Sequence, residues 1–179
     1  MPAGRGDRSR QINRSHSPVL ARSVPALTVM IGSMLQTLPM IGSAPLVPPF
    51  GFLVMLAWRQ LHPGLLPVWA GLPLGLVDDL FSGQPMGSAM LLWSIAMIAF
   101  DLIEQRFPWR SYHLDWAVAG AAIILYLLTC GFIAHASRGL DFIVTLGPQL
   151  MLSVLIFPLV ERLIALCDRM RLARFRTIT

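Results

Sequence analysis

Arginine placement is the feature that most constrains the fold of this chain. Fourteen arginines and no lysine lie at the two ends of the sequence and beside the ends of long apolar runs. Hydrophobic residues make up 55% of the 179 residues and charged residues only 13%, and the mean hydropathy is +0.66. A soluble core of this length does not need so apolar a composition. The sequence therefore predicts an all-α membrane protein that forms one compact unit.

Six apolar runs are candidates for membrane-spanning helices, each of which needs roughly 17–25 residues. The first, fifth and sixth runs meet this length. The second is short and opens near a proline pair, and the third ends in two carboxylates. We therefore expect a bundle of six transmembrane helices, with five or four as alternatives. The runs cover residues 24–41, 46–61, 64–81, 86–103, 116–136 and 142–160.

The positive-inside rule predicts the orientation of these helices. With both termini in the cytoplasm, every arginine except Arg138 falls on the cytoplasmic side. A four-span alternative, in which the second and third runs form a re-entrant hairpin, puts Arg59 and His62 at membrane depth. A charged side chain there costs roughly 2.5–3.5 kcal/mol on the mildest scale. The cytoplasmic set is Arg5, Arg8, Arg10, Arg14, Arg22, Arg59, Arg106, Arg110, Arg162, Arg169, Arg171, Arg174 and Arg176.

Composition divides the chain into three parts. Residues 1–22 are expected to be a disordered, arginine-rich cytoplasmic tail, residues 23–167 the transmembrane helical domain, and residues 168–179 a basic cytoplasmic tail. The net charge is +5. Because the basic tails adjoin the membrane, anionic lipids are their expected partner and nucleic acid is not.

The third apolar run and the turn after it hold the most suggestive polar residues. Gly71, Gly75 and Asp78 share one helix face in this interpretation, and Asp79 points about 100° away, so the two carboxylates cannot share one role. The glycines suggest a face that packs closely against another helix. Asp78 and Asp79 could be solvated at the outer boundary, bind a partner, fill a polar pocket, or take part in ion or proton translocation.

Other polar residues have less specific interpretations. Trp58 is expected at a membrane interface and Arg59 at the inner boundary. Asp101 and Glu104 open a mixed-charge cytoplasmic connection that is solvated surface or a docking site for a cytoplasmic partner. The in-span glutamines, Gln36 and Gln149, suggest hydrogen bonds between helices.

Catalytic and metal-binding patterns are not found in the sequence. It contains no P-loop, GxSxG or HExxH motif, and its four histidines are scattered. The two cysteines, Cys130 and Cys167, would lie at different membrane depths, so no disulfide is expected. The sequence predicts no enzyme, no catalytic residue, no cofactor and no metal site.

One segment, residues 49–93, resembles the signature region of the rod shape-determining protein MreD family. The shared pattern is an apolar run ending in Trp, a following Pro, and then G-L-x-x-D-L-x-x-G-x-P-x-G. By this resemblance Asp79, rather than Asp78, is the aspartate of the family. Outside this segment the likeness is one of hydropathy and length. The matching residues are Trp58, Pro63, Gly75, Leu76, Asp79, Leu80, Gly83, Pro85 and Gly87.

The resemblance implies a non-enzymatic, multi-pass component of the bacterial inner (cytoplasmic) membrane in the cell-elongation, or rod, complex. Its implied partners are MreC, and through it MreB and the peptidoglycan synthases. We expect Asp79→Ala to weaken complex formation without abolishing membrane insertion. The partner-binding or structural candidates are Trp58, Arg59, Pro63, Gly71, Gly75, Asp78, Asp79, Gly83, Pro85 and Gly87.

A weaker resemblance provides an alternative of another class. Small six-helix membrane proteins also include the substrate-binding subunits of energy-coupling-factor vitamin transporters, and the MreD family is thought to share their general architecture. A small-molecule-binding subunit would need a polar pocket in the outer half of the bundle. The residues available for it are Asp78, Gln84, Trp93 and Gln149.

Overall fold

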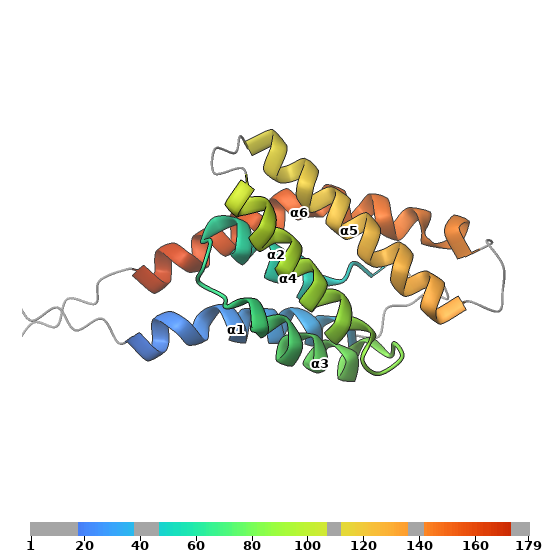
Figure 1. Ribbon diagram of the computed structural model, residues 1–179, viewed down its shortest axis with the longest axis horizontal. Coiled ribbons are helices and arrows are strands. Elements are labelled where there is room, and N and C mark those ends of the chain that lie inside the picture. Colours follow the sequence, from blue (N-terminus) through green and yellow to red (C-terminus); the bar gives the residue numbers. More distant parts are fainter. Residues whose placement is uncertain (1–17, 38–46, 107–111, 136–141, 173–179) are drawn as a thin grey trace, which may run out of the picture.

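The computed structural model describes residues 18–37, 47–106, 112–135 and 142–172 (Figure 1). Segment 1–17 of the arginine-rich tail lies outside these ranges, and so do Arg110, Arg138 and segment 173–179. Within the described ranges every regular element is helical, which confirms the all-α prediction.

Each of the six apolar runs overlaps one α-helix. Two short 3-10 turns, η1 (Leu35–Thr37) and η2 (Val68–Ala70), accompany them. α1 begins inside the segment assigned to the N-terminal tail, and α6 continues into the segment assigned to the C-terminal tail. The helices are α1 (Pro18–Met34), α2 (Phe50–Leu61), α3 (Gly71–Ser82), α4 (Ser88–Arg106), α5 (Tyr112–His135) and α6 (Phe142–Leu172).

Helix length separates the six helices into three long ones, two short ones and α1, which has 17 residues. Three segments in the described part are long and apolar enough to cross a membrane: Ser88–Arg106, His113–Ala134 and Leu146–Met170. α2 and α3 have 12 residues each. At 1.5 Å per residue each is about 18 Å long, less than the roughly 30 Å of a bilayer core. Prolines shorten both helices, since Pro48 and Pro49 precede α2 and Pro67 precedes η2.

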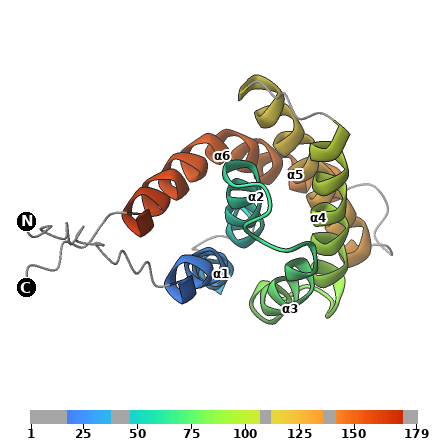
Figure 2. The same ribbon diagram turned by 60° about the vertical axis from the view of Figure 1, so that its left-hand side comes forward.

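α2 lies in the middle of the bundle, with α1, α5 and α6 packed around it (Figure 2). Phe52, Leu53, Met55, Leu56 and Ala57 are all buried, so they occupy most of its circumference. A helix that is apolar on every side is buried, either in lipid or among other helices, and in α2 the other helices surround it. The shortness of α2 is therefore compatible with its central position, because its ends meet protein rather than lipid.

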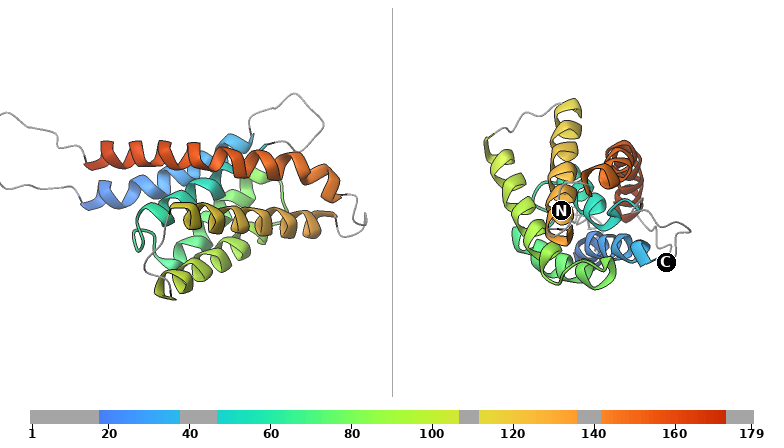
Figure 3. Two further views of the ribbon diagram at one scale, coloured as in Figure 1. Left: turned by 90° about the horizontal axis from the view of Figure 1, so that it is seen from above. Right: turned by 90° about the vertical axis from the view of Figure 1, so that its right-hand side faces the viewer.

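The remaining helices form two hairpins around this centre. α3 packs along α4, and α5 packs along α6. The first turns of α1 and the last turns of α6 lie side by side at one end of the bundle (Figures 1 and 3). The expectation that both termini are cytoplasmic stays a prediction.

The outer surface of the bundle is apolar. On α4 the exposed residues Leu91, Ile95, Ile98 and Leu102 follow one another at helical spacing. α6 exposes a similar row of apolar residues. These faces are suited to contact with lipid or with apolar helices of a partner. The row on α6 consists of Met151, Leu155, Leu159, Leu163 and Leu166.

Candidate functional site

Two glycines of α3 let the α4 backbone approach unusually closely. A Cβ added at Gly75 would lie 2.6 Å from Met90 Cα and 2.8 Å from Ala89 O. One added at Gly71, four residues earlier, would lie 2.9 Å from Trp93 O. Any larger residue at these positions would force the two helices apart. The prediction of a small-residue packing face is confirmed, and its partner is α4.

Asp79 continues this face and caps the first turn of α4. Its carboxylate accepts hydrogen bonds from the backbone N–H groups of Gly87 (2.9 Å), Ala89 (2.9 Å) and Met90 (3.2 Å), and from the Ser88 hydroxyl (3.3 Å). The N-terminal N–H groups of a helix have no partner within the helix and carry a partial positive charge. Asp79 supplies both the acceptors and the opposite charge, and it is only 3% exposed.

The last three residues of the G-L-x-x-D-L-x-x-G-x-P-x-G pattern, Gly83, Pro85 and Gly87, lie in the turn between α3 and α4. Gly83 ends α3 with φ 67°, and Gly87 precedes α4 with φ 93°. Both lie in the left-handed region that residues with a side chain adopt at a cost. The Pro85 carbonyl accepts a hydrogen bond from Ser88 N (3.1 Å). The pattern G-L-x-x-D-L-x-x-G-x-P-x-G thus encodes the α3–α4 hairpin.

Asp78 points to a different part of the bundle. It accepts a hydrogen bond from Gln36 Nε2 at 2.8 Å and a long one from the Tyr126 hydroxyl at 3.5 Å, so it joins α3 to η1 and α5. Asp78 does not take part in the α4 contact of the glycine face, because its carboxyl group bonds to η1 and α5 instead. Solvation at the outer boundary was wrong, since both carboxylates are buried. The prediction that the two have separate roles is confirmed.

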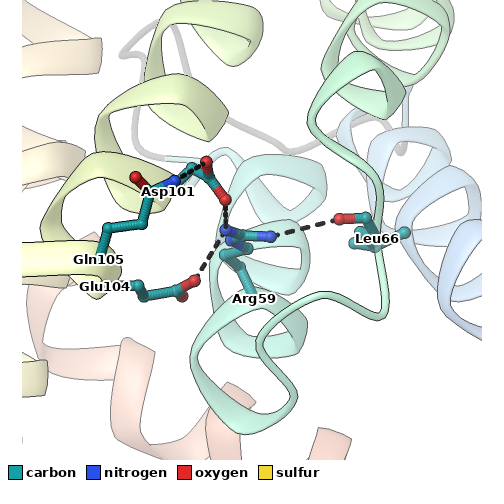
Figure 4. Close-up of polar contacts among 5 residues, drawn as sticks. All are labelled: Arg59, Leu66, Asp101, Glu104 and Gln105. Atoms are coloured by element: carbon teal, nitrogen blue, oxygen red, sulfur yellow. Dashed lines mark hydrogen bonds and ion pairs between the residues drawn. The ribbon is translucent and has the colours of Figure 1, made fainter. Parts of the chain in front are cut away.

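An ion cluster in the last turn of α2 joins the buried Arg59 to the partly exposed Asp101 and Glu104 (Figure 4). Arg59 Nη2 lies 2.8 Å from Asp101 Oδ1 and 2.7 Å from Glu104 Oε2. Its Nη1 donates to the Leu66 carbonyl at 3.3 Å, and Gln105 donates to Asp101 Oδ2 at 2.7 Å. Arg59 is 2% exposed. The cluster ties the end of α2 to the last turns of α4 and to the α2–α3 connection.

The sequence analysis missed this cluster. It expected the two carboxylates on solvated surface or in a docking site, and it expected Arg59 to anchor the membrane boundary. Two features of the sequence could have indicated it. A single arginine, Arg59, lies near the end of the second apolar run, and two carboxylates three residues apart, Asp101 and Glu104, lie at the end of the fourth. Because such charges are costly to bury alone, their pairing could have been proposed.

Trp58 was also expected at an interface, but the structure places it in the core. Its indole Nε1 donates to Thr28 Oγ1 of α1 at 2.7 Å, and it is fully buried. Next to it, His62 ends α2 and contacts Asp168 of α6 at 2.8 Å. Pro63, which follows, is exposed in the turn.

The in-span glutamines act as predicted, by bonding between segments. Gln36 reaches Asp78, as described above, and Gln149 Nε2 donates to the Val47 carbonyl at 2.6 Å. Of the residues proposed for a ligand pocket, Gln84 accepts from the Ser88 hydroxyl at 3.4 Å. Within the described residues, no group of three His, Cys, Asp or Glu side chains is arranged to hold a metal.

Polar side chains join the helices inside the bundle, its surface is apolar, and three helices are of spanning length. These features are those of the class of helical membrane proteins. The chain belongs to the family of the rod shape-determining protein MreD, whose sequence model matches residues 18–169. That family acts in determining rod shape, is associated with the membrane, and is not known to be enzymatic. No curated protein and no solved structure matches the chain.

Proposed function

We propose that the protein is a non-enzymatic scaffold of the rod complex in the bacterial inner membrane, connecting MreC and MreB to the peptidoglycan synthases. Family membership over residues 18–169 is the observation that carries this proposal. The internal contacts are of the kind a scaffold needs. Asp79 and Arg59 hold helices to one another rather than facing an open cleft.

In this proposal the signature residues act on partners indirectly. They hold the α3–α4 hairpin in one shape, and the outward side chains of the hairpin provide the contact surface. Leu80 is 62% exposed, and Trp69 and Met86 are also exposed. Exposed apolar side chains held at fixed positions can pack against the transmembrane helix of a partner such as MreC.

The arginine side chains at one end of the bundle support the proposed orientation, in which both termini are cytoplasmic. The ends of α2, α4 and α6 meet there through the contacts of Arg59 with Glu104 and of His62 with Asp168. Arg106, Arg162 and Arg169 are exposed at the same end. If this end is cytoplasmic, these side chains can contact anionic lipid head groups.

Co-purification tests the scaffold proposal. We expect the tagged protein, extracted from its host in mild detergent, to carry MreC and a peptidoglycan synthase with it. As the sequence predicts, Asp79→Ala should lower the total amount of MreC recovered without abolishing membrane insertion. The reason is a lower yield of folded protein, so the amount of MreC per folded molecule should stay close to that of the wild type. Leu80→Ala should lower that ratio without lowering the yield. Absence of MreC from the wild-type preparation would contradict the proposal.

A further inference from the structure

Asp78 is a buried carboxyl group whose setting the scaffold role does not explain. It is 0% exposed, in the last turns of α3. The groups around it come from four other segments: Ser33 of α1, Gln36 of η1, Gly51 of α2 and Tyr126 of α5. α2 approaches so closely that a Cβ on Gly51 would lie 2.8 Å from Asp78 Oδ1. Water is thereby excluded from this oxygen.

Nothing around Asp78 in the described part of the chain carries a positive charge. The ion pairs there involve Arg59 and His62, and neither includes Asp78. The titratable groups that act on Asp78 are Asp79 of α3 and Tyr126 and Cys130 of α5. All three are acids. α1, η1, α2 and α4 contribute only neutral groups, so a negative charge on Asp78 would be buried without compensation, at high cost.

The adjacent Asp79, by contrast, is a buried carboxylate whose negative charge is balanced by hydrogen-bond donors. It accepts three backbone N–H groups from the positive end of α4 and one hydroxyl. Asp78 receives one short bond from a neutral amide and one long bond from a phenol, and the Ser33 hydroxyl lies beside it. Ser33 Oγ is buried and makes no other hydrogen bond among the described residues. A hydroxyl can donate to a carboxylate or accept from a carboxylic acid, so Ser33 can accept the proton of a protonated Asp78.

We propose that Asp78 is a proton-binding site, with its carboxyl group protonated in the folded protein at neutral pH. The proton comes from water as the bundle closes and returns to water when α1, α3 and α5 separate. A proton fits better than a sodium ion, because Gln36 presents its amide nitrogen to Oδ1, where a cation would need an oxygen. The packing of these helices then depends on the proton, so loss of the proton favours an opened bundle that admits water.

Infrared spectroscopy of the full chain in lipid nanodiscs tests this proposal. Aspartate labelled with ¹³C at its side-chain carboxyl separates aspartic from glutamic acid bands. At neutral pH we expect one carboxylic acid C=O band that shifts with the label. The band should be lost in Asp78→Asn and retained in Asp79→Asn, the matched control one residue away.

Three results would overturn the proposal. One is a labelled wild-type spectrum without an aspartic acid band, a measurement that does not depend on whether a variant folds. Another is an acid band that persists in folded Asp78→Asn, or that disappears instead in Asp79→Asn. The third is a sodium-dependent rise in the melting temperature of the wild type that Asp78→Asn abolishes, since this would identify a metal cation as the occupant.

Discussion

Replacing Gly75 by alanine tests how closely α3 approaches α4. The added Cβ would lie 2.6 Å from Met90 Cα, 2.8 Å from Met90 N and 2.8 Å from Ala89 O. Ordinary contacts begin at 3.4 Å, so the nearest atom would have to withdraw by about 0.8 Å, the difference between 3.4 and 2.6 Å. All three atoms belong to the backbone, and none can rotate away. The two helices must therefore separate along the contact.

The expected cost follows from two opposing effects. Overpacking a well-packed interface costs about 1–3 kcal/mol, and rigid backbone neighbours place this case at the upper end. Alanine regains about 1 kcal/mol of helix propensity over glycine. We therefore expect Gly75→Ala to lower the free energy of unfolding by about 2 kcal/mol.

Gly120→Ala is the matched control. Gly120 is also inside a helix, α5, but a Cβ there would meet only Val154 Cγ1 at 3.7 Å, an ordinary contact. Only the propensity gain remains, so this variant should be as stable as the wild type or up to about 1 kcal/mol more stable. The measurement is unfolding by sodium dodecyl sulfate in mixed micelles, followed by circular dichroism. Equal stability of Gly75→Ala and Gly120→Ala would refute the close approach.

Three further contacts are tested by the same unfolding measurement. Asp79→Ala should cost about 1–3 kcal/mol because buried N–H groups of α4 lose their acceptor, and Asp79→Asn, which keeps one acceptor oxygen, should cost less; equal losses would argue against the cap. Arg59→Ala should cost about 1–3 kcal/mol because the partly exposed carboxylates of Asp101 and Glu104 lose their donor. The exposed Arg106→Ala should stay within about 0.5 kcal/mol of the wild type, and a similar loss in both would contradict the Arg59 cluster. Trp58→Phe should cost about 1 kcal/mol through its bond to Thr28, and an unchanged stability would show that this bond contributes nothing.

Hydropathy predicted the helices well because burial and lipid contact select the same residues. Each apolar run overlaps one α-helix. Of the first, fifth and sixth runs, which were expected to reach spanning length, the fifth and sixth do so, whereas α1 of the first run has 17 residues; the fourth run yields the remaining helix of spanning length. The central position of α2 could not be predicted in this way. A run that is apolar on all sides can be surrounded by lipid or by protein, and hydropathy does not distinguish the two.

The polar contacts were harder to predict because packing decides them. A three-residue spacing from Gly75 selects Asp78 and a four-residue spacing selects Asp79, and both fit one helix face. The family pattern pointed to Asp79, and the cap on α4 shows its physical role. Arg59 meets its carboxylates 42 and 45 residues away along the chain, on a helix whose orientation no local pattern fixes.

Depletion of the protein in its rod-shaped bacterial host, with cell shape scored by microscopy, tests the central claim most directly. We expect rods to become round while nutrient uptake stays unchanged, with rescue by the wild-type gene. Cells that keep their shape during depletion, or that require an added nutrient instead, would contradict a scaffold role in rod-shape determination.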